Sequence, residues 1–153
     1  MNRLSMAGLL SVLGLLLSIP ASASDIQTRP VRFKEGESSI TIKAALRGRQ
    51  TVDYSLPARA GQTMSVTFSS SNRSAYFNVM PPGSTWDAMF VGSTEGDVWA
   101  GVLPSDGEYR IRVYLYRNAA RRNERAGYTL TIGIADPDPG AASSADAKVA
   151  GGR

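Results

Sequence analysis

Arginine side chains concentrate in one stretch of the 153-residue sequence, at residues 117–126. Arg117 and Arg121 stand four positions apart, so in a turn of helix both guanidinium groups would leave the same side. A guanidinium group can donate two parallel hydrogen bonds to one carboxylate, which suits the binding of an acidic partner. Arg122 and Arg125 add positive charge to the same stretch. A solvated loop kept soluble by its charge would show the same composition.

The residue types that most enzymes use are missing. The chain has no histidine and no cysteine, which excludes Ser-His-Asp and Cys-His nucleophiles, thiol redox chemistry, and zinc sites built on imidazole or thiolate. Asp87, Glu95 and Asp97 are the nearest thing to an acidic catalytic group, but they lie in a Gly/Ser/Thr-rich stretch where such residues commonly form turns. The sequence therefore predicts a protein that is not an enzyme, with no catalytic residue, metal site or cofactor.

A cluster of arginines also suits phosphate binding, which raises nucleic acid as an alternative partner. Tyr114 and Tyr116, on the outer face of an expected strand, could stack on bases, although paired aromatic residues on strands more often pack across neighbouring strands. The first 23 residues indicate export, as described below, which argues against this partner, and we predict that the protein binds no nucleic acid.

The first 23 residues have the pattern of a signal peptide. A single basic residue, Arg3, precedes the apolar run LLSVLGLLLSI and the small residues that end at Ala23. The apolar run is shorter than the roughly 20 residues that a membrane span needs, and no cysteine follows it to carry a lipid. We expect cleavage after Ala23 and a periplasmic protein without a membrane anchor.

Two alternating runs flank the arginine-rich stretch and must position it. Apolar residues at every second position are typical of half-buried strands. Here they are Tyr109, Ile111, Val113 and Leu115 in the first run, and Tyr128, Leu130, Ile132 and Ile134 in the second. We interpret the two runs as a hairpin. Its ten-residue connection, from Arg117 to Ala126, exceeds the about two to five residues usual in hairpins, and it has room for one or two turns of helix.

Similar alternation recurs along the rest of the chain. Further strands are expected, with turn residues between them, at 31–33, 40–46, 52–56, 64–68, 75–80, 89–91 and 98–103. About seven to nine short strands without a sustained helical period predict an all-β fold, an antiparallel β-sandwich or a small barrel. It would span residues 31–135, after a polar leader at 24–30. Residues 136–153 have no apolar period and predict a disordered tail.

The stretch from residue 103 to residue 134 also carries a recognisable pattern. It contains LP-x-x-G-x-Y, then R-N-x-A-R, then Y-x-[LV]-x-I-x-I. The residues that match are Leu103, Pro104, Gly107, Tyr109, Arg117, Asn118, Ala120, Arg121, Tyr128, Leu130, Ile132 and Ile134. This pattern resembles the bacterial periplasmic inhibitors of goose-type (g-type) lysozyme. Weaker similarity extends back to residue 33, through FKEGESSITIKAALRG, the Asp53-Tyr54 pair and the AxxGQ segment at 58–62.

The resemblance implies a periplasmic β-sandwich that binds a lysozyme and inhibits it. It implies that the cationic loop enters the substrate groove, where glycoside hydrolysis relies on acidic residues, and that Arg117 and Arg121 make the contact. The spacing of the arginines alone does not establish this mode of action. Secondary candidates for the contact are Tyr54, Arg122, Ser105, Asp106, Gly107 and Tyr109. Arg125, nearer the returning strand, is expected to contribute little.

The turn before Tyr109 departs from the family pattern. Inhibitors of this broader group commonly have Ser-Gly-x-Tyr, whereas this chain has Asp106-Gly107-Glu108-Tyr109. Two added carboxylates would repel an acidic cleft if the turn touched it. Gly107 is expected to supply a positive φ angle. Tyr54 alternates with apolar neighbours, so it also fits a place in the core or at its rim.

A different class of protein would explain the fold equally well. An exported, non-catalytic β-sandwich module could bind envelope polysaccharide or another envelope protein without using the loop. The sequence leaves open which type of lysozyme is inhibited, with what affinity, and whether the protein forms a homodimer through an exposed strand edge.

Overall fold

Two stacked β-sheets make up the protein in this computed structural model, which describes residues 26–137. Sheet A has the order β1-β3-β8-β5-β6 and sheet B the order β2-β9-β4-β7. The strands of sheet A are β1 (Ile26–Pro30), β3 (Thr51–Ala58), β5 (Ala75–Met80), β6 (Phe90–Val91) and β8 (Gly107–Leu115). Those of sheet B are β2 (Ser39–Arg47), β4 (Thr63–Ser70), β7 (Val98–Val102) and β9 (Arg125–Ala135). The described residues also form two short helices, α1 (Gly92–Glu95) and α2 (Arg117–Arg121).

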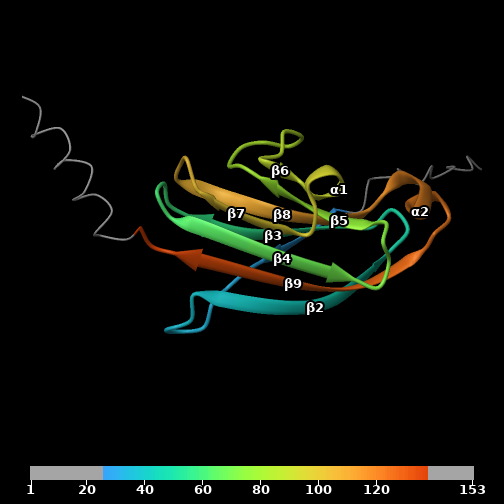
Figure 1. Cartoon of the computed structure of the whole chain (residues 1–153), viewed down its shortest axis with the longest axis horizontal. Coiled ribbons are helices and arrows are strands. Elements are labelled where there is room, and N and C mark those ends of the chain that lie inside the picture. The colour runs from blue at the N-terminus through green and yellow to red at the C-terminus, as the bar shows by residue number, and fades with distance from the viewer. Residues whose placement is uncertain (1–25, 138–153) are drawn as a thin grey trace, which may run out of the picture.

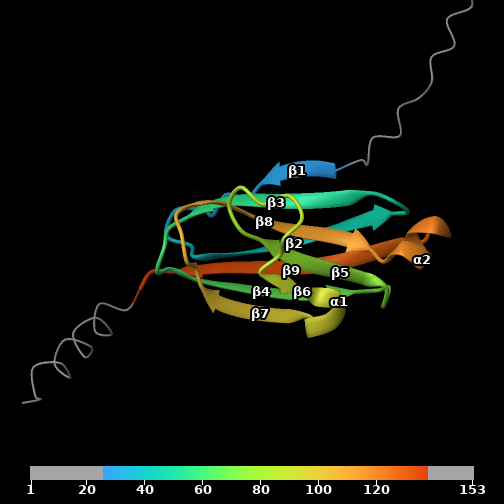
Figure 2. The same ribbon diagram turned by 90° about the horizontal axis from the view of Figure 1, so that it is seen from above.

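This architecture confirms the predicted all-β sandwich. The described strands form two separate sheets and do not close into a barrel, as Figure 1 shows from the side. Neighbouring strands run antiparallel except at one edge, where β1 and β3 are parallel. In Figure 2 β1 lies along one margin of the molecule and β7 along the other.

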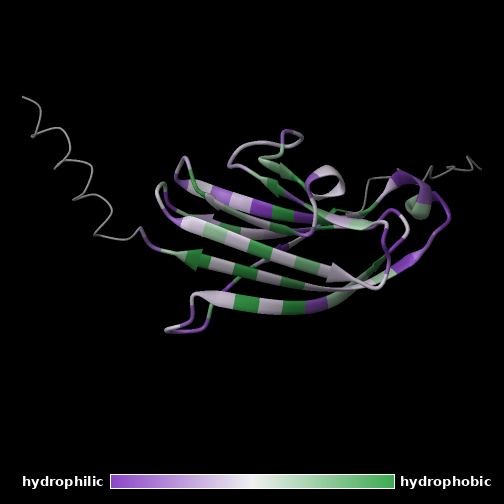
Figure 3. Cartoon of the chain, viewed as in Figure 1, coloured by the Kyte–Doolittle hydropathy of each residue, from purple (hydrophilic) through white to green (hydrophobic). Residues whose placement is uncertain are grey.

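The alternating apolar residues build the core between the sheets. Tyr109, Ile111 and Val113 of β8 are 0% exposed, and so are Leu130 and Ile132 of β9. Polar and apolar residues alternate along β4 and β9 in Figure 3, because successive side chains point to opposite faces of a strand. Burying one large apolar side chain stabilises a fold by about 1.5–3 kcal/mol. The core therefore needs no disulfide to hold it.

The predicted hairpin of β8 and β9 is wrong. β8 pairs with β3 and β5 in sheet A, whereas β9 pairs with β2 and β4 in sheet B. Alternation identifies the buried face of a strand but not its neighbour, and here the two buried faces meet across the core. The connection between β8 and β9 therefore crosses from one sheet to the other, over the roughly 10 Å that separates stacked sheets. This crossing accounts for its length, and the predicted turn of helix within it is α2.

The amino-terminal edge strand also differs from the expectation. It lies at Ile26–Pro30, within the predicted polar leader, and not at residues 31–33. All five residues of β1 are exposed, so no buried face marks the strand in the sequence. Main-chain pairing with β3 defines it instead. Val31, which follows β1, is 7% exposed and enters the core.

The connections between strands collect at two ends of the sandwich. One end carries the β2–β3 turn, the β4–β5 loop and α2, which are tied together by Gly48 N–H donating to Glu124 O (2.8 Å) and Tyr116 N–H donating to Ser74 O (2.7 Å). The opposite end carries the β3–β4 turn and the segment between β7 and β8. Figure 1 shows α2 at the right-hand end.

The predicted signal peptide at 1–23 and most of the predicted tail at 136–153 lie outside the described residues. Asp136, at the start of that tail, accepts hydrogen bonds from Arg59 (3.0 Å) and Gln62 (2.8 Å). Among residues 26–137, no helix is long and apolar enough to cross a membrane.

Candidate partner-binding site

The helix α2 is a single turn fixed to the sandwich at both ends. Ala119 on its inner side is 0% exposed and packs in the core. Tyr116 N–H, just before the helix, donates to Ser74 O (2.7 Å), and Glu124 O, just after it, accepts from Gly48 N–H (2.8 Å). Asn123 reverses the chain with a φ of 55°, a left-handed conformation that asparagine tolerates better than most residues. The backbone of α2 is therefore held in place.

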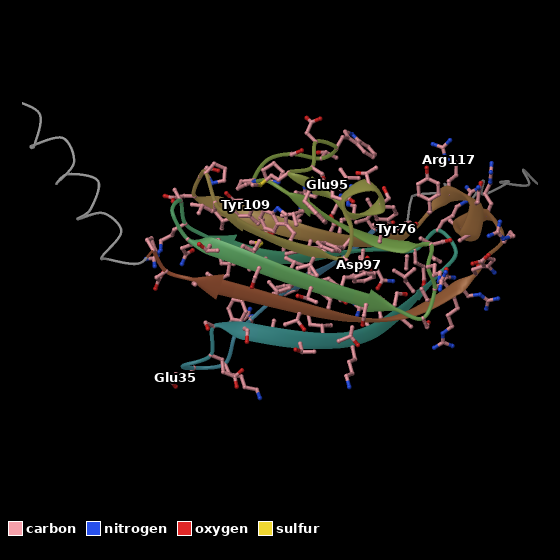
Figure 4. The ribbon with its side chains drawn as sticks, in the orientation of Figure 1. Glu35, Tyr76, Glu95, Asp97, Tyr109 and Arg117 are labelled. Atoms are coloured by element: carbon pink, nitrogen blue, oxygen red, sulfur yellow. The ribbon has the colours of Figure 1, made fainter. Side chains whose placement is uncertain are left out.

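The two principal candidates lie on this helix and face solvent. Arg117 and Arg121 are both exposed, and neither makes an ion pair within residues 26–137. Arg121 donates from Nη2 to Asn118 Oδ1 at 2.7 Å. Figure 4 shows Arg117 at the α2 end of the molecule, and Figure 3 shows that α2 and the start of β9 are largely hydrophilic. Both guanidinium groups are available to an anionic partner.

Arg122 is engaged within the protein. Its Nε donates to Glu124 Oε1 at 2.7 Å, and Asn72 Nδ2 donates to Glu124 Oε2 at 2.8 Å. The hydrogen bond from Asn72, and then that from Arg122, hold the pKa of Glu124 below its usual value. The charge of Arg122 is thus partly neutralised, which distinguishes it from its neighbours on α2.

Further arginines that the sequence reasoning did not select gather around α2. Arg47 comes from the end of β2, Arg49 from the β2–β3 turn and Arg73 from the β4–β5 loop, and the three side chains are exposed. We call this end of the sandwich the arginine end, defined by Arg47, Arg49, Arg73, Arg117, Arg121, Arg122 and Arg125. No motif marks the first three, and only the strand pairing, such as Arg47 opposite Arg125, brings them together.

Two other arginines, on the outer face of β8, serve the fold. Arg112 makes two bonds of 2.8 Å to the Asp53 carboxylate, and Arg110 lies 3.5 Å from it. Arg112 Nη1 also donates to Thr85 O at 3.1 Å, and Arg110 donates to Ser84 O. The bond to Asp53 raises the pKa of Arg112. These groups tie the loop between β5 and β6 to sheet A.

Tyr54 lies in the core, as its alternation suggested. It is 2% exposed, and its hydroxyl lies 2.7 Å from that of Tyr128. A buried phenol cannot reach a partner, so Tyr54 is not available for direct contact. Its role in this structure is to join sheet A to sheet B.

The Ser105–Tyr109 turn is separated from α2 by the full length of β8. Gly107 has a φ of 144°, and a Cβ atom there would meet Pro82 at 2.6 Å, which supports the expected structural role. Tyr109 is 0% exposed and donates from its hydroxyl to Ser105 O at 2.8 Å. Asp106 Oδ1 accepts from Ala60 N–H at 2.8 Å. Nine residues of strand at about 3.3 Å each place this turn roughly 30 Å from α2.

The distance between α2 and the Ser105–Tyr109 turn determines which candidate residues can contact the same part of a partner. Figure 4 shows Tyr109 and Arg117 toward opposite ends of the molecule. Ser105 and Asp106 are exposed but lie with Tyr109, while Gly107 is half-buried. The structure therefore brings Arg117, Arg121 and Arg122 together and keeps the Ser105–Tyr109 turn apart from them.

The chemistry of the arginine end is that of anion binding. Among residues 26–137 no group of three or more His, Cys, Asp or Glu side chains is arranged to hold a metal. Of the acidic residues considered as a catalytic group, Glu95 accepts a hydrogen bond on its carboxylate Oε1 from Val91 N–H at 2.8 Å. Asp97 and Asp87 accept hydrogen bonds on their backbone carbonyls, from Phe68 N–H (2.9 Å) and from the Ser84 hydroxyl (2.8 Å). What the arginine end offers is donors for carboxylates.

Comparison with known proteins agrees with the pattern in the sequence. No protein-family model matches the chain. An inhibitor of g-type lysozyme from Escherichia coli (strain K12) is 31% identical over 107 residues, which cover 68% of this chain and 78% of that protein. The chain belongs to the family of g-type lysozyme inhibitors. Members of this family are inhibitors and not enzymes, so the prediction of a non-catalytic protein is confirmed.

Solved structures of g-type lysozyme inhibitors have the same fold. PliG from Aeromonas hydrophila, a periplasmic lysozyme inhibitor of g-type lysozyme, is 37% identical, and the match covers 74% of this chain and 100% of that one with a TM-score of 0.69. PliG from Salmonella Typhimurium is 27% identical, with 71% and 98% covered and a TM-score of 0.56. Both are periplasmic proteins, in agreement with the periplasmic location predicted from the sequence.

Proposed function

We propose that this protein binds a g-type lysozyme and inhibits it by inserting α2 into the active-site cleft. Arg117 and Arg121 would contact the acidic residues there. The observation that carries the proposal is the pair of exposed arginines on one helical turn that Ala119 anchors in the core. The named relatives from Escherichia coli and Aeromonas hydrophila are inhibitors of g-type lysozyme, which supports the same target.

The chemistry of the target explains how arginines could inhibit it. Glycoside hydrolysis generally depends on carboxylic acids that line the substrate groove, one of which donates a proton. A guanidinium group beside such an acid lowers its pKa and keeps it ionised, so it can no longer act as the proton donor. At the same time α2 would occupy the space that the polysaccharide needs. Inhibition therefore requires no chemistry by the inhibitor.

The fixed geometry of α2 favours tight binding. Its backbone is bonded at both ends, and the Arg121 guanidinium is already positioned by Asn118 at 2.7 Å. Side chains that are ordered before association lose less conformational entropy on binding. The bidentate geometry of guanidinium and carboxylate adds directional specificity.

The proposal is tested by a bacterial cell-wall clearing assay with goose-, chicken- and invertebrate-type lysozymes, with and without the purified protein. We expect strong inhibition of the goose type. Arg117→Ala and Arg121→Ala should each raise the inhibition constant at least about tenfold, because a buried charge pair that loses one member costs about 2–5 kcal/mol. The melting temperature should hardly change, since exposed side chains contribute little to folding.

Two control variants distinguish the loss of a specific contact from the loss of one positive charge. Arg59→Ala removes the same charge at the opposite end of the sandwich, from a side chain that is 73% exposed, and should leave the inhibition constant unchanged. Arg125→Ala, at the start of β9, should have a small effect. Wild-type-like inhibition by Arg117→Ala and Arg121→Ala would show that α2 is only a solvated connection. Unchanged clearing by all three lysozymes would favour a non-catalytic envelope-binding module instead.

A further inference from the structure

The β2–β3 turn is locked against the segment that follows α2. Gly48 N–H donates to Glu124 O at 2.8 Å, and Arg47 Nε donates to Asn123 O at 3.2 Å. Gly48 has a φ of 59°, and a Cβ atom there would meet Asn123 Oδ1 at 2.5 Å. Only glycine allows this close approach without a shift. Arg49, the next residue in the turn, is thereby held at a fixed position relative to α2.

A pocket with an unusually cationic lining opens between this turn and α2. It is lined by Arg47, Arg49, Gln50, Ala120, Arg121 and Asn123, and we call it the Arg49 pocket. Three of these side chains carry a positive charge and none carries a negative one. Within residues 26–137 no carboxylate forms an ion pair with any of the three.

Such a lining favours an anion. Three like charges around one hollow repel each other, and an anion placed between them relieves that repulsion. Arg47 already uses its Nε on Asn123 O, and Arg121 uses Nη2 on Asn118 Oδ1. Arg49 makes no such side-chain bond within the described residues, so of the three guanidinium groups its own is the most available to bind a ligand.

The Arg49 pocket is continuous with the surface proposed to enter the lysozyme cleft. Arg121 lines this pocket and also a second one with Tyr114, Tyr116, Arg117 and Asn118. A protein that covers α2 would therefore lie over both pockets.

We infer that the Arg49 pocket receives a carboxylate side chain from the rim of the lysozyme cleft, with Arg49 as a further contact residue. This inference rests on the proposed function. A second ionic contact, supplied by a different connection of the sandwich, would fix the rotation of α2 within the cleft. Two anchors on a rigid surface define an orientation, whereas a single helical turn does not.

The test is a double-mutant comparison with purified full-length protein and a g-type lysozyme. Arg49→Ala should raise the dissociation constant by about 5- to 30-fold, as expected for a partly exposed charge contact. The same factor should appear when Arg49→Ala is added to Arg117→Ala, because contacts that share no partner are additive. Arg49→Lys should recover only part of the loss, since lysine keeps the charge but not the bidentate fork.

Arg59→Ala serves again as the charge-matched control, and a thermal melt of each variant identifies any loss of folding. A dissociation constant for Arg49→Ala within twofold of wild type, with Arg117→Ala impaired, would overturn the inference and leave the proposed function standing. Absence of binding by the wild-type protein would overturn both. Inorganic phosphate is also titrated into the wild-type protein and into Arg49→Ala, to test whether the pocket binds small anions. If Arg49→Ala abolishes phosphate binding but leaves lysozyme binding unchanged, the pocket takes small anions and the inference is wrong.

Discussion

The hydroxyl groups of Tyr54 and Tyr128 lie 2.7 Å apart in the core and connect sheet A to sheet B. Burial and this hydrogen bond raise the pKa of Tyr128, so the Tyr128 phenol stays neutral. Tyr54→Phe would leave the Tyr128 hydroxyl buried without this partner, which costs about 1–3 kcal/mol. We expect urea unfolding to report a loss of that size and the clearing assay to report unchanged inhibition. If Tyr54→Phe impairs inhibition without lowering the free energy of unfolding, Tyr54 contributes to the contact with the lysozyme.

The buried carboxylate of Asp53 should be far more important for stability than an exposed one. The Asp53 side chain is 1% exposed and faces Arg110 and Arg112. Asp53→Ala would leave both guanidinium groups without their counter-charge, at a cost of about 3–5 kcal/mol. Asp136→Ala is the matched control, because the Asp136 side chain is 70% exposed and exposed pairs contribute at most about 1 kcal/mol. Equal effects of the two substitutions in denaturant unfolding would contradict this prediction.

The two carboxylates that depart from the family pattern should not affect inhibition. Asp106 and Glu108 lie at the end of the sandwich opposite α2, where they cannot repel a cleft that receives the helix. Asp106→Ala should cost about 0.5–1.5 kcal/mol, since Ala60 N–H loses its acceptor. The inhibition constants of Asp106→Ala and Glu108→Ala should stay within about twofold of wild type. A tenfold change in either direction would mean that this end also touches the lysozyme.

Acid should weaken the attachment of α2 through Glu124. Its pKa is lowered in the folded protein by Asn72 and Arg122, so the ionised carboxylate stabilises the fold above its unfolded pKa. That stability is lost as the pH falls through the lowered folded value. The free energy of unfolding of the wild type should therefore fall more steeply toward low pH than that of Glu124→Gln, as followed by denaturant unfolding at a series of pH values. Parallel profiles would show that Glu124 contributes nothing.

The sequence predicts buried faces better than it predicts neighbours. Alternation in β8 and β9 correctly marked Tyr109 and Leu130 as core, because burial depends on side-chain type. It could not reveal that the two strands belong to different sheets, since pairing is made by the backbone, which is common to all residues. β1 was missed for the same reason: an edge strand with no buried face has no apolar period.

The sequence likewise predicted some residues of the candidate site and missed others. Arg117 and Arg121 stand four apart in a recognisable motif, and both lie on α2 as expected. Arg49 could not be found from the sequence, because its closeness to Arg121 depends on the fold of a different connection. The availability of Arg122 also depends on the fold, through the position of Asn72 beside Glu124.

The connection that carries α2 from one sheet to the other sets a condition for any peptide mimic of this segment. A hairpin scaffold brings its strands within about 5 Å of each other, whereas stacked sheets are about 10 Å apart. Grafting residues 116–124 onto a hairpin tip would draw the ends of the segment too close together and change the position of Arg117 relative to Arg121. A macrocycle whose linker spans the wider gap, with an apolar group in place of the core beneath Ala119, would preserve their relative geometry.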